Sequence, residues 1–120
     1  MSDPIIYLYQ GCSTCRKAQA WLHEHGIAVE ERPIRERSPT LAQLRLALVS
    51  VEGQRRRICN TSSNDYRESG LKDRLEHLNQ TAFFKELQQN GNMIKRPLLI
   101  DGDRALVGFD PERWAAFFGR

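Results

Sequence analysis

Two cysteines three positions apart, Cys12 and Cys15 in the segment GCSTC, are the residues whose types and spacing could do chemistry. Such a pair can act as a redox dithiol, in which one thiolate attacks a disulfide and the second thiol closes on the first. It can also supply half of a metal site, which needs two more ligands. The remaining sulfur and imidazole ligands are Cys59, His23, His25 and His77. Because the chain has no second Cys-x-x-Cys and no His-x₃₋₅-His pair, the redox dithiol is favoured and no metal is expected.

The residues around the two cysteines predict how their thiols are tuned. Cys12 falls at a strand-to-helix turn and Cys15 in the first turn of the helix, where positions three apart are neighbours. A helix N-terminus offers free N–H groups and partial positive charge, which favour a thiolate. We therefore expect Cys12 to attack and Cys15, which faces the core, to resolve the mixed disulfide. Ser13, Thr14 and Arg16, between and beside the cysteines, are the predicted substrate contacts.

The dipeptide Arg96-Pro97 is the second candidate site. A proline at this place can simply open an edge strand. It can also form a cis-proline turn, opposite the cysteines, that leaves neighbouring backbone free to pair with an extended substrate. In the second interpretation Arg96 presents a cation to the thiolate or to an anionic substrate.

Two β-rich ends enclose a helical middle section. The first end reads as strand 5–9, helix 14–25 stopped by Gly26, and strand 27–31, an arrangement that predicts a parallel pair. The last end reads as a hairpin of strands 97–100 and 105–107 across Asp101-Gly102, then a helix that begins after Asp110 with Pro111 at its first position. Between them, a Thr40–Gln43 capping box begins one helix, and helices are expected over 64–69 and 81–89.

This order predicts an α/β fold with a mixed four-stranded sheet, of the thioredoxin-like (glutaredoxin-like) type. The helical insertion would span about 33–96, within a single domain over residues 1–120. Lone Cys59 is interpreted as a small buried hydrophobe.

Composition narrows the class of protein. The formal charge is only +3, and the one basic run, Gln54–Arg57, lacks interleaved aromatics, so no direct nucleic-acid binding is expected. No apolar run has the length of a membrane span, and the N-terminus does not read as a signal peptide. Three cysteines, an odd number, argue against a secreted disulfide framework, so we expect a cytoplasmic protein with no membrane association.

Three segments in order resemble the arsenate reductase (ArsC) and Spx-related family, whose thioredoxin-like core carries a helical insertion. They are LYQGCSTCRKAQAWLHEHGI (8–27), NTSSNDYRESGL (60–71) and IKRPLLIDGDRALVGFDPERW (94–114). Together they cover nearly the whole chain. The resemblance implies a thiol-disulfide oxidoreductase that holds no bound cofactor and is reduced by glutathione, glutaredoxin or thioredoxin. Its substrate would be a small anion, such as arsenate, or a disulfide.

The arsenate reductase branch implies a cysteine at the Cys12 position that attacks arsenate, held by three arginines. Arg96 matches the one before the cis-proline. The residue after Asn60-Thr61 is Ser62, where relatives often carry arginine, and the third position falls within 106–109, which has none. The nearest substitutes are Arg55, Arg56, Arg57, Arg67 and Arg104.

The Spx branch implies a different class of function. There the Cys-x-x-Cys pair is a redox switch on a regulator that binds RNA polymerase without turnover. The present chain keeps the pair Cys12 and Cys15 and the motif Val107-Gly108-Phe109 of that branch. A redox-sensing transcriptional regulator is therefore the alternative to an enzyme.

Overall fold

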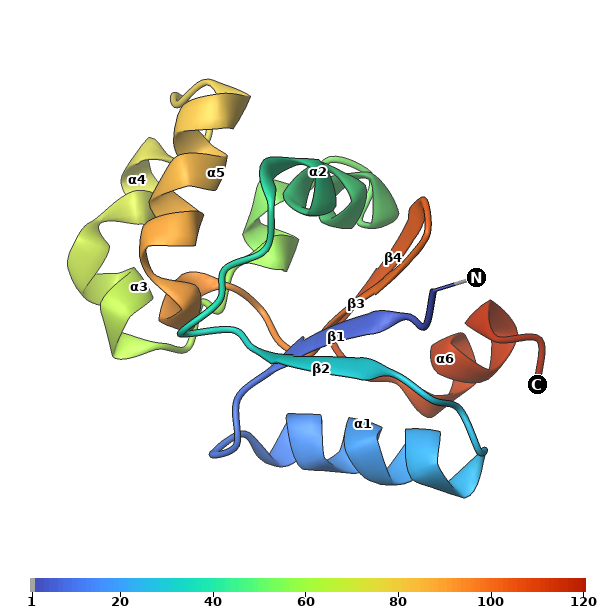
Figure 1. Ribbon diagram of the computed structural model, residues 1–120. Helices are drawn as coiled ribbons and strands as arrows, with labels where there is room; N and C mark the ends of the chain where they lie inside the picture. Colours follow the sequence, from blue (N-terminus) through green and yellow to red (C-terminus); the bar gives the residue numbers. More distant parts are fainter. Residues whose placement is uncertain (1) are drawn as a thin grey trace.

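The computed structural model describes residues 2–120 (Figure 1). The chain begins with strand β1 (Ile5–Leu8), helix α1 (Ser13–Glu24) and strand β2 (Glu30–Pro33). The middle section consists of helix α2 (Leu41–Ser50), the 3₁₀ helix η1 (Arg55–Ile58), helices α3 (Asn64–Ser69), α4 (Leu71–Arg74) and α5 (Gln80–Gln89), and the 3₁₀ helix η2 (Gly91–Met93). The chain ends with strands β3 (Leu98–Asp101) and β4 (Arg104–Val107) and helix α6 (Pro111–Phe117).

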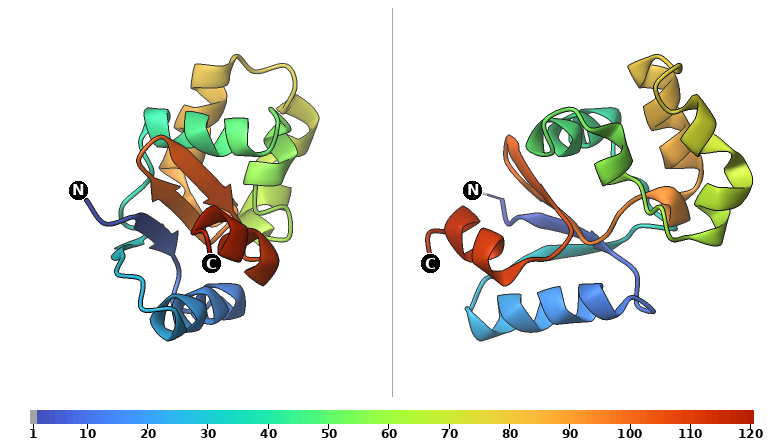
Figure 2. Two further views of the ribbon diagram at one scale, coloured as in Figure 1. Left: turned by 90° about the vertical axis from the view of Figure 1, so that its right-hand side faces the viewer. Right: turned by 180° about the vertical axis from the view of Figure 1, so that it is seen from behind.

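The four strands form one mixed sheet in the order β2-β1-β3-β4, which confirms the predicted fold class. Strand β1 is parallel to β2 and antiparallel to β3, and β3 is antiparallel to β4. Helices α1 and α6 lie on one face of the sheet and α2 on the other, while α3, α4 and α5 extend beyond one end of it (Figures 1 and 2). The thiol segment follows β1 at that same end (Figure 1).

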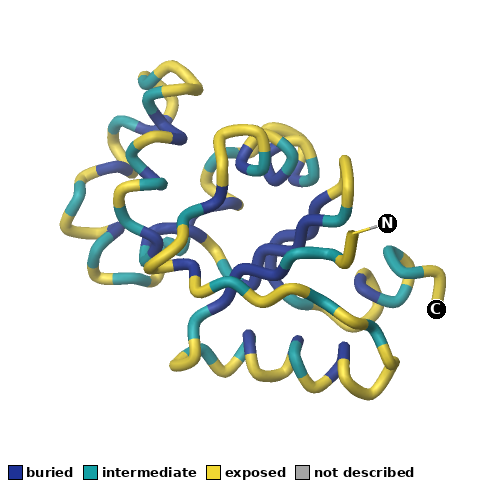
Figure 3. The backbone as a smooth tube through the Cα atoms, viewed as in Figure 1, coloured by how far each residue is buried: buried dark blue, intermediate teal, exposed yellow. Residues whose placement is uncertain are grey.

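Alternation along the strands divides the core into two layers. On the α1 and α6 side, Ile6, Leu8, Leu99 and Leu106 pack with Trp114. The alternate residues of the strands point to the other side, where they pack against α2 and the apolar residues of the insertion. These strand residues are Tyr7, Leu98, Ile100, Ala105 and Val107. The central strands are accordingly buried along most of their length (Figure 3). Because side chains on a strand point alternately to its two faces, a short strand can serve both layers.

Helix α1 has the buried face that its sequence predicts. Cys15, Ala18, Trp21 and Leu22 are all buried and lie at spacings of three and four. The ring of Trp21 meets Trp114 edge to face at a centroid distance of 5.8 Å. This packing fixes α1 under the sheet, and with it the position of the cysteines at its N-terminus.

Strand β2 differs from its prediction. It spans Glu30–Pro33 rather than 27–31, and Ile5 of β1 is paired with Glu30. The apolar Ile27 and Val29, which suggested a strand, instead pack beneath the sheet in the α1 layer. The strand itself is polar and mostly exposed because it forms the sheet edge.

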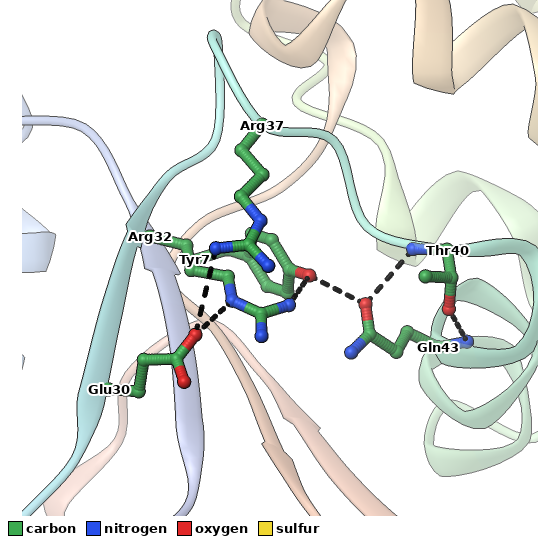
Figure 4. Close-up of polar contacts among 6 residues, drawn as sticks. All are labelled: Tyr7, Glu30, Arg32, Arg37, Thr40 and Gln43. Carbon is green, nitrogen blue, oxygen red and sulfur yellow. Dashed lines mark hydrogen bonds and ion pairs between the residues drawn. The ribbon is translucent and has the colours of Figure 1, made fainter.

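A polar network joins the helical insertion to the sheet (Figure 4). The hydroxyl of Tyr7 donates to Oε1 of Gln43 at 2.6 Å and accepts a hydrogen bond from Nη1 of Arg32 at 2.9 Å. Gln43 also forms the predicted capping box with Thr40 at the start of α2. Arg32 is paired with Glu30 on the same strand. The start of α2 is therefore held over β1 and β2.

The other predicted helices are confirmed with small boundary shifts. Helix α3 covers the expected residues, and Gly70 ends it in the left-handed conformation with φ of 71°. Helix α5 begins one residue before the predicted range, and Asp110 caps α6 with Pro111 next to it. The short elements η1, α4 and η2 had no sequence prediction. Among residues 2–120, no helix is both long enough and apolar enough to cross a bilayer.

Candidate functional site

The site begins with Cys12, which is the N-cap residue of α1. Its extended backbone (φ −96°, ψ 117°) lets the Sγ atom accept a hydrogen bond from the backbone N–H of Cys15 at 3.3 Å. Cys12 is partly exposed, whereas Cys15 is only 1% exposed, and both are free thiols. The backbone N–H of Cys12 donates to the carbonyl of Tyr9 at 3.1 Å, which fixes the turn between β1 and α1. One accessible sulfur therefore lies at a helix N-terminus, with a buried sulfur behind it.

The surroundings of the two thiols shift their pKa values in opposite directions. Partial burial opposes ionisation of Cys12, but hydrogen bonds from Cys15 and the guanidinium of Arg96 outweigh it and hold the pKa of Cys12 below its ordinary value. Burial raises the pKa of Cys15 to about 12, and the adjoining Cys12 sulfur adds to that effect. Cys12 is therefore the more readily ionised thiol of the pair, whereas Cys15 is protonated at neutral pH.

Arg96 and Pro97 lie at this site, and the peptide bond between them is cis. The carbonyl of Pro97 accepts a hydrogen bond from the N–H of Gly108 at 2.8 Å, which joins the start of β3 to the residue after β4. The guanidinium carbon of Arg96 lies 4.8 Å from the ring centroid of Tyr9. Nη1 of Arg96 is buried and has no hydrogen-bond partner among the described residues. Arg96 thus has donor capacity left beside the Cys12 thiolate.

Two residues of the site were missed by sequence reasoning: Tyr9 and Arg35. The Tyr9 ring carries a second guanidinium, because the guanidinium carbon of Arg35 lies 4.9 Å from its centroid. Gly11 makes room for that ring, since a Cβ on Gly11 would lie 2.6 Å from Cε2 of Tyr9. The glycine in the GCSTC segment is a signal that could have indicated a close approach there. Nothing in the sequence indicates that Arg35 contacts Tyr9, which lies 26 positions earlier.

The other predicted contacts surround the cysteines. Ser13 is exposed and Thr14 is half-buried, both in the first turn of α1. Arg16 is exposed, and its Nη1 donates to the carbonyl of Gln10 at 3.0 Å, so it braces the loop before Cys12. Cys59 is 2% exposed, which confirms its interpretation as a buried hydrophobe. Among residues 2–120, no group of three or more Cys, His, Asp or Glu side chains is arranged to hold a metal ion.

Two arginines suggested as substitutes for the missing clamp residues are engaged away from the thiols. Arg55 donates to the carbonyls of Leu75 and Leu78, at 2.8 and 2.7 Å. Arg104 lies over the ring of Phe117 at 3.9 Å, at the opposite end of the β3–β4 hairpin. Two others, Arg56 and Arg67, line a cavity of about 300 Å³ around Tyr66. Of the arginines, only Arg96 and Arg35 lie against Tyr9 in the described part of the chain.

A cavity of about 430 Å³ borders the thiol site on the β2 side. It is lined by Leu8, Tyr9, Gln10, Glu31, Arg32, Pro33 and Glu36. Tyr9 lines this cavity and also contacts the guanidiniums of Arg35 and Arg96.

Similar proteins include representatives of both branches that the sequence suggested, and one uncharacterised protein. An uncharacterised protein of Bacillus subtilis, YusI, is 40% identical over 115 residues, which is 92% of this chain and 97% of that protein. The global transcriptional regulator Spx 2 of Bacillus anthracis is 31% identical, over 97% of this chain and 87% of its own. The crystal structure of a possible arsenate reductase from Streptococcus mutans superposes with a TM-score of 0.82 at 31% identity, over 91% of this chain and 92% of that one.

The fold, the dithiol and the likeness to both branches agree with the match to a family model. The model of the ArsC family covers residues 7–117, from the first strand to the last helix and including both cysteines and Arg96. This chain therefore belongs to the ArsC family.

Proposed function

We propose that this protein is a thiol–disulfide oxidoreductase whose reaction begins with attack by the Cys12 thiolate. The observation that carries the proposal is the hydrogen bond from the Cys15 N–H to Sγ of Cys12 at a helix N-terminus, beside Arg96. These groups stabilise negative charge on the one sulfur of the pair that solvent reaches. A low-pKa, accessible thiol next to a second cysteine is typical of redox catalysis rather than of a structural dithiol.

The proposed chemistry with a disulfide substrate has two exchange steps. The Cys12 thiolate attacks one sulfur of the substrate, forms a mixed disulfide and releases the other sulfur as a thiolate. Cys15 then loses its proton and attacks Sγ of Cys12, which releases the second substrate thiolate and leaves a Cys12–Cys15 disulfide. Two electrons pass to the substrate, and two thiols from glutathione, glutaredoxin or thioredoxin restore the dithiol.

The order of these steps follows from the electrostatics of the pair. The largest cause of the raised pKa of Cys15 is burial, which persists throughout the reaction. Two smaller effects raise that pKa further: the hydrogen bond to Cys12 and the negative charge of Cys12. Both effects disappear when Cys12 is in a mixed disulfide, so Cys15 ionises more easily at the step in which it must attack.

Arsenate is the substrate that the family suggests. Attack of Cys12 on the arsenic atom would expel one oxygen as water, and attack of a second thiol on Sγ of Cys12 would release the arsenic as As(III). Arg96 supports this reaction because its unpartnered Nη1 can donate to an oxyanion. The other two family arginine positions hold different residues, Ser62 and the segment 106–109, so disulfide reduction is the form of the activity that the site supports best.

The experiment is a coupled assay with purified protein, NADPH, glutathione reductase, glutathione and glutaredoxin. It is run once with arsenate and once with a mixed disulfide of glutathione, for the parent chain, Cys12→Ser and Cys59→Ser. We expect turnover above that of a blank without this protein, because glutaredoxin and glutathione alone also reduce mixed disulfides. This excess turnover should be lost in Cys12→Ser and kept in Cys59→Ser, because Cys59 is buried apart from the site. Turnover that survives the loss of Cys12 would refute the proposed role of this cysteine.

The alternative function is redox-sensing regulation through contact with RNA polymerase. It is favoured by the 31% identity with a global transcriptional regulator over 97% of this chain. In that case formation of the Cys12–Cys15 disulfide would alter a binding surface and no turnover would follow. A pull-down of RNA polymerase that differs between dithiothreitol and diamide, together with an inactive coupled assay, would favour the regulator. Either function is consistent with a cytoplasmic location, where the proposed reductants and polymerase are found.

A further inference from the structure

An anionic substrate at the thiol site would need more positive charge than Arg96 alone supplies. A single guanidinium near the surface binds an anion weakly, because water competes for the same charge. Only one of the three arginines that the family resemblance implies is present, Arg96. The suggested substitutes Arg55 and Arg104 are engaged elsewhere, and Arg56 and Arg67 line a different cavity. Besides Arg16, which is bonded to the carbonyl of Gln10, the folded chain brings one further cation to Tyr9.

Arg35 is that residue. Its guanidinium carbon lies 4.9 Å from the centroid of the Tyr9 ring, and that of Arg96 lies 4.8 Å from the same centroid, so the two cations are at most about 10 Å apart. The aromatic ring holds both guanidiniums by cation–π attraction and leaves their N–H groups free for other bonds. The thiol of Cys12 lies beside Arg96. Two cations therefore contact one aromatic ring, and one of them, Arg96, also lies beside Cys12.

The backbone of Arg35 is held in place from two sides. The preceding residue, Ile34, is fully buried and donates its N–H to the carbonyl of Leu8 in β1 at 3.0 Å. On the other side lies Gly91, whose absent Cβ would be 2.2 Å from the carbonyl oxygen of Ile34 and 3.0 Å from Cα of Arg35. The 3₁₀ helix η2 therefore packs directly against the backbone of the segment that carries Arg35. A guanidinium mounted on such a fixed backbone loses less freedom when it binds a ligand.

The donors of Arg35 are not used within the protein. Its guanidinium forms no hydrogen bond or ion pair with any other residue in the range 2–120. The nearby carboxylate of Asp65, whose pKa is lowered partly by Arg35, is instead held by the side-chain amides of Asn90 and Asn92, both at 2.9 Å. Arg37, two residues on, lies near Glu30 at 3.9 Å on the surface. Arg35 is therefore a cation whose donors are free among the described residues, on the Tyr9 ring that Arg96 also contacts.

We propose that Arg35 is the second binding cation of the thiol site and that, with Arg96, it holds the anionic group of the substrate that Cys12 attacks. This inference rests on the proposed function, because it takes the Cys12 thiol as the reacting group. The ligand chemistry is an oxygen anion, supplied either by an inorganic oxyanion or by the carboxylate of a glutathione-like peptide. Arg35 thereby replaces, from the loop after β2, a clamp position that the family fills from elsewhere in the chain.

The test measures anion binding without turnover. Reduced protein is alkylated with iodoacetamide, which is neutral, and its reaction at Cys12 is followed by mass spectrometry in the presence of rising sulfate or rising S-methylglutathione. Neither probe can be reduced, so each acts only by occupying the site. The variants are Arg35→Gln and, as the matched control, Arg37→Gln, which removes an arginine from the same exposed segment.

We expect the half-protecting concentration to rise roughly ten- to a hundredfold in Arg35→Gln, the factor expected when one charge-assisted hydrogen bond is lost. It should change less than about twofold in Arg37→Gln, whose ion pair is exposed. The probe that shows the loss identifies the anion: sulfate for an oxyanion, S-methylglutathione for a peptide carboxylate. Protection is expressed relative to each variant's own alkylation rate without probe, so that a change in the reactivity of Cys12 itself does not enter the comparison.

Two results would overturn the proposal. One is protection of Arg35→Gln equal to that of the parent chain, and the other is absence of protection by either probe in the parent chain. Failure of the proposed function looks different, because it is a parent chain that binds these anions and yet shows no turnover in the coupled assay. Arg35→Lys adds a further check: it keeps the charge but not the planar fork, so partial retention of protection is expected.

Discussion

Replacing Gly91 by alanine should destabilise the fold, although the usual effect of removing a glycine has the opposite sign. Gly91 begins η2 and does not have a positive φ, so alanine fits its backbone conformation. At such a position, Gly→Ala normally stabilises by about 0.4–1 kcal/mol, because the unfolded chain loses freedom. Here a Cβ would lie 2.2 Å from the carbonyl oxygen of Ile34, whereas ordinary contacts begin near 3.4 Å. The gap must therefore open by more than an ångström.

The atoms that must move belong to the backbone, so they cannot rotate away as a side chain would. The carbonyl carbon of Ile34 would be 2.8 Å and Cα of Arg35 3.0 Å from the new methyl group. Overpacking of this kind costs about 1–3 kcal/mol when side chains alone adjust, and we expect the upper end, about 3 kcal/mol, where a buried backbone must shift. The steric cost exceeds the entropic gain, so the net change is a loss of roughly 2 kcal/mol or more.

The assay is urea unfolding followed by tryptophan fluorescence, since Trp21 and Trp114 are both buried. The control is Gly53→Ala, where φ is 80° and nothing lies within 4 Å of the new Cβ, so only backbone strain of about 1–2 kcal/mol is expected. Gly91→Ala should also weaken anion protection of Cys12, because it displaces the segment that carries Arg35. Gly91→Ala at parent stability would refute the close approach of η2 to Ile34.

Three further outcomes are expected. Trp114→Phe should lower the free energy of unfolding by roughly 2–3 kcal/mol, because it removes the hydrogen bond from Nε1 to the carbonyl of Gly108 (3.1 Å) and leaves that buried acceptor unpaired. Urea unfolding measures this change, and a loss below about 0.5 kcal/mol would contradict the prediction. Gly11→Ala should change stability by less than about 1 kcal/mol yet weaken sulfate protection of Cys12, because the clashing atom at 2.6 Å is the movable ring edge of Tyr9; unchanged protection contradicts the role of that ring. Burial raises the pKa of Cys59 from 9.0 to about 12, so the stability that its protonated thiol contributes is complete below pH 9. As the pH rises from 9 toward 12, this contribution declines by at most about 1.4 kcal/mol per pH unit. The loss of unfolding free energy in Cys59→Ala should therefore shrink between pH 9 and 12 and stay constant below pH 9.

Residues whose structure depends on near neighbours were predictable from the sequence. The buried face of α1, the Thr40–Gln43 capping box and the Asp110 cap each rely on spacings of three or four, which local pattern fixes. The placement of Cys12 at the N-cap and Cys15 one turn later followed from the same logic. These local features were sufficient to locate the dithiol and to infer the order of reactivity of its two sulfurs.

Several features that depend on distant parts of the chain were not predicted. The strand 27–31 was placed too early because Ile27 and Val29 are apolar, and nothing local shows that they pack under the sheet rather than within it. The meeting of Tyr9, Arg35 and Arg96 needs three segments to converge. It also needs Gly91, whose missing side chain has a meaning only once Ile34 lies against it.

The same convergence suggests how the helical insertion serves the thiol site. A thioredoxin-like core alone provides the helix N-terminus and the proline turn, which are enough to lower the pKa of one thiol. They do not provide a binding site, because Cys12 reacts with whatever anion or disulfide reaches it. The insertion adds η2, which fixes the loop after β2 and places Arg35 over Tyr9. Under the proposal that Arg35 holds the substrate anion, the reactivity of the site comes from the core, whereas its selectivity comes from the insertion, which carries Arg35 and packs η2 against it.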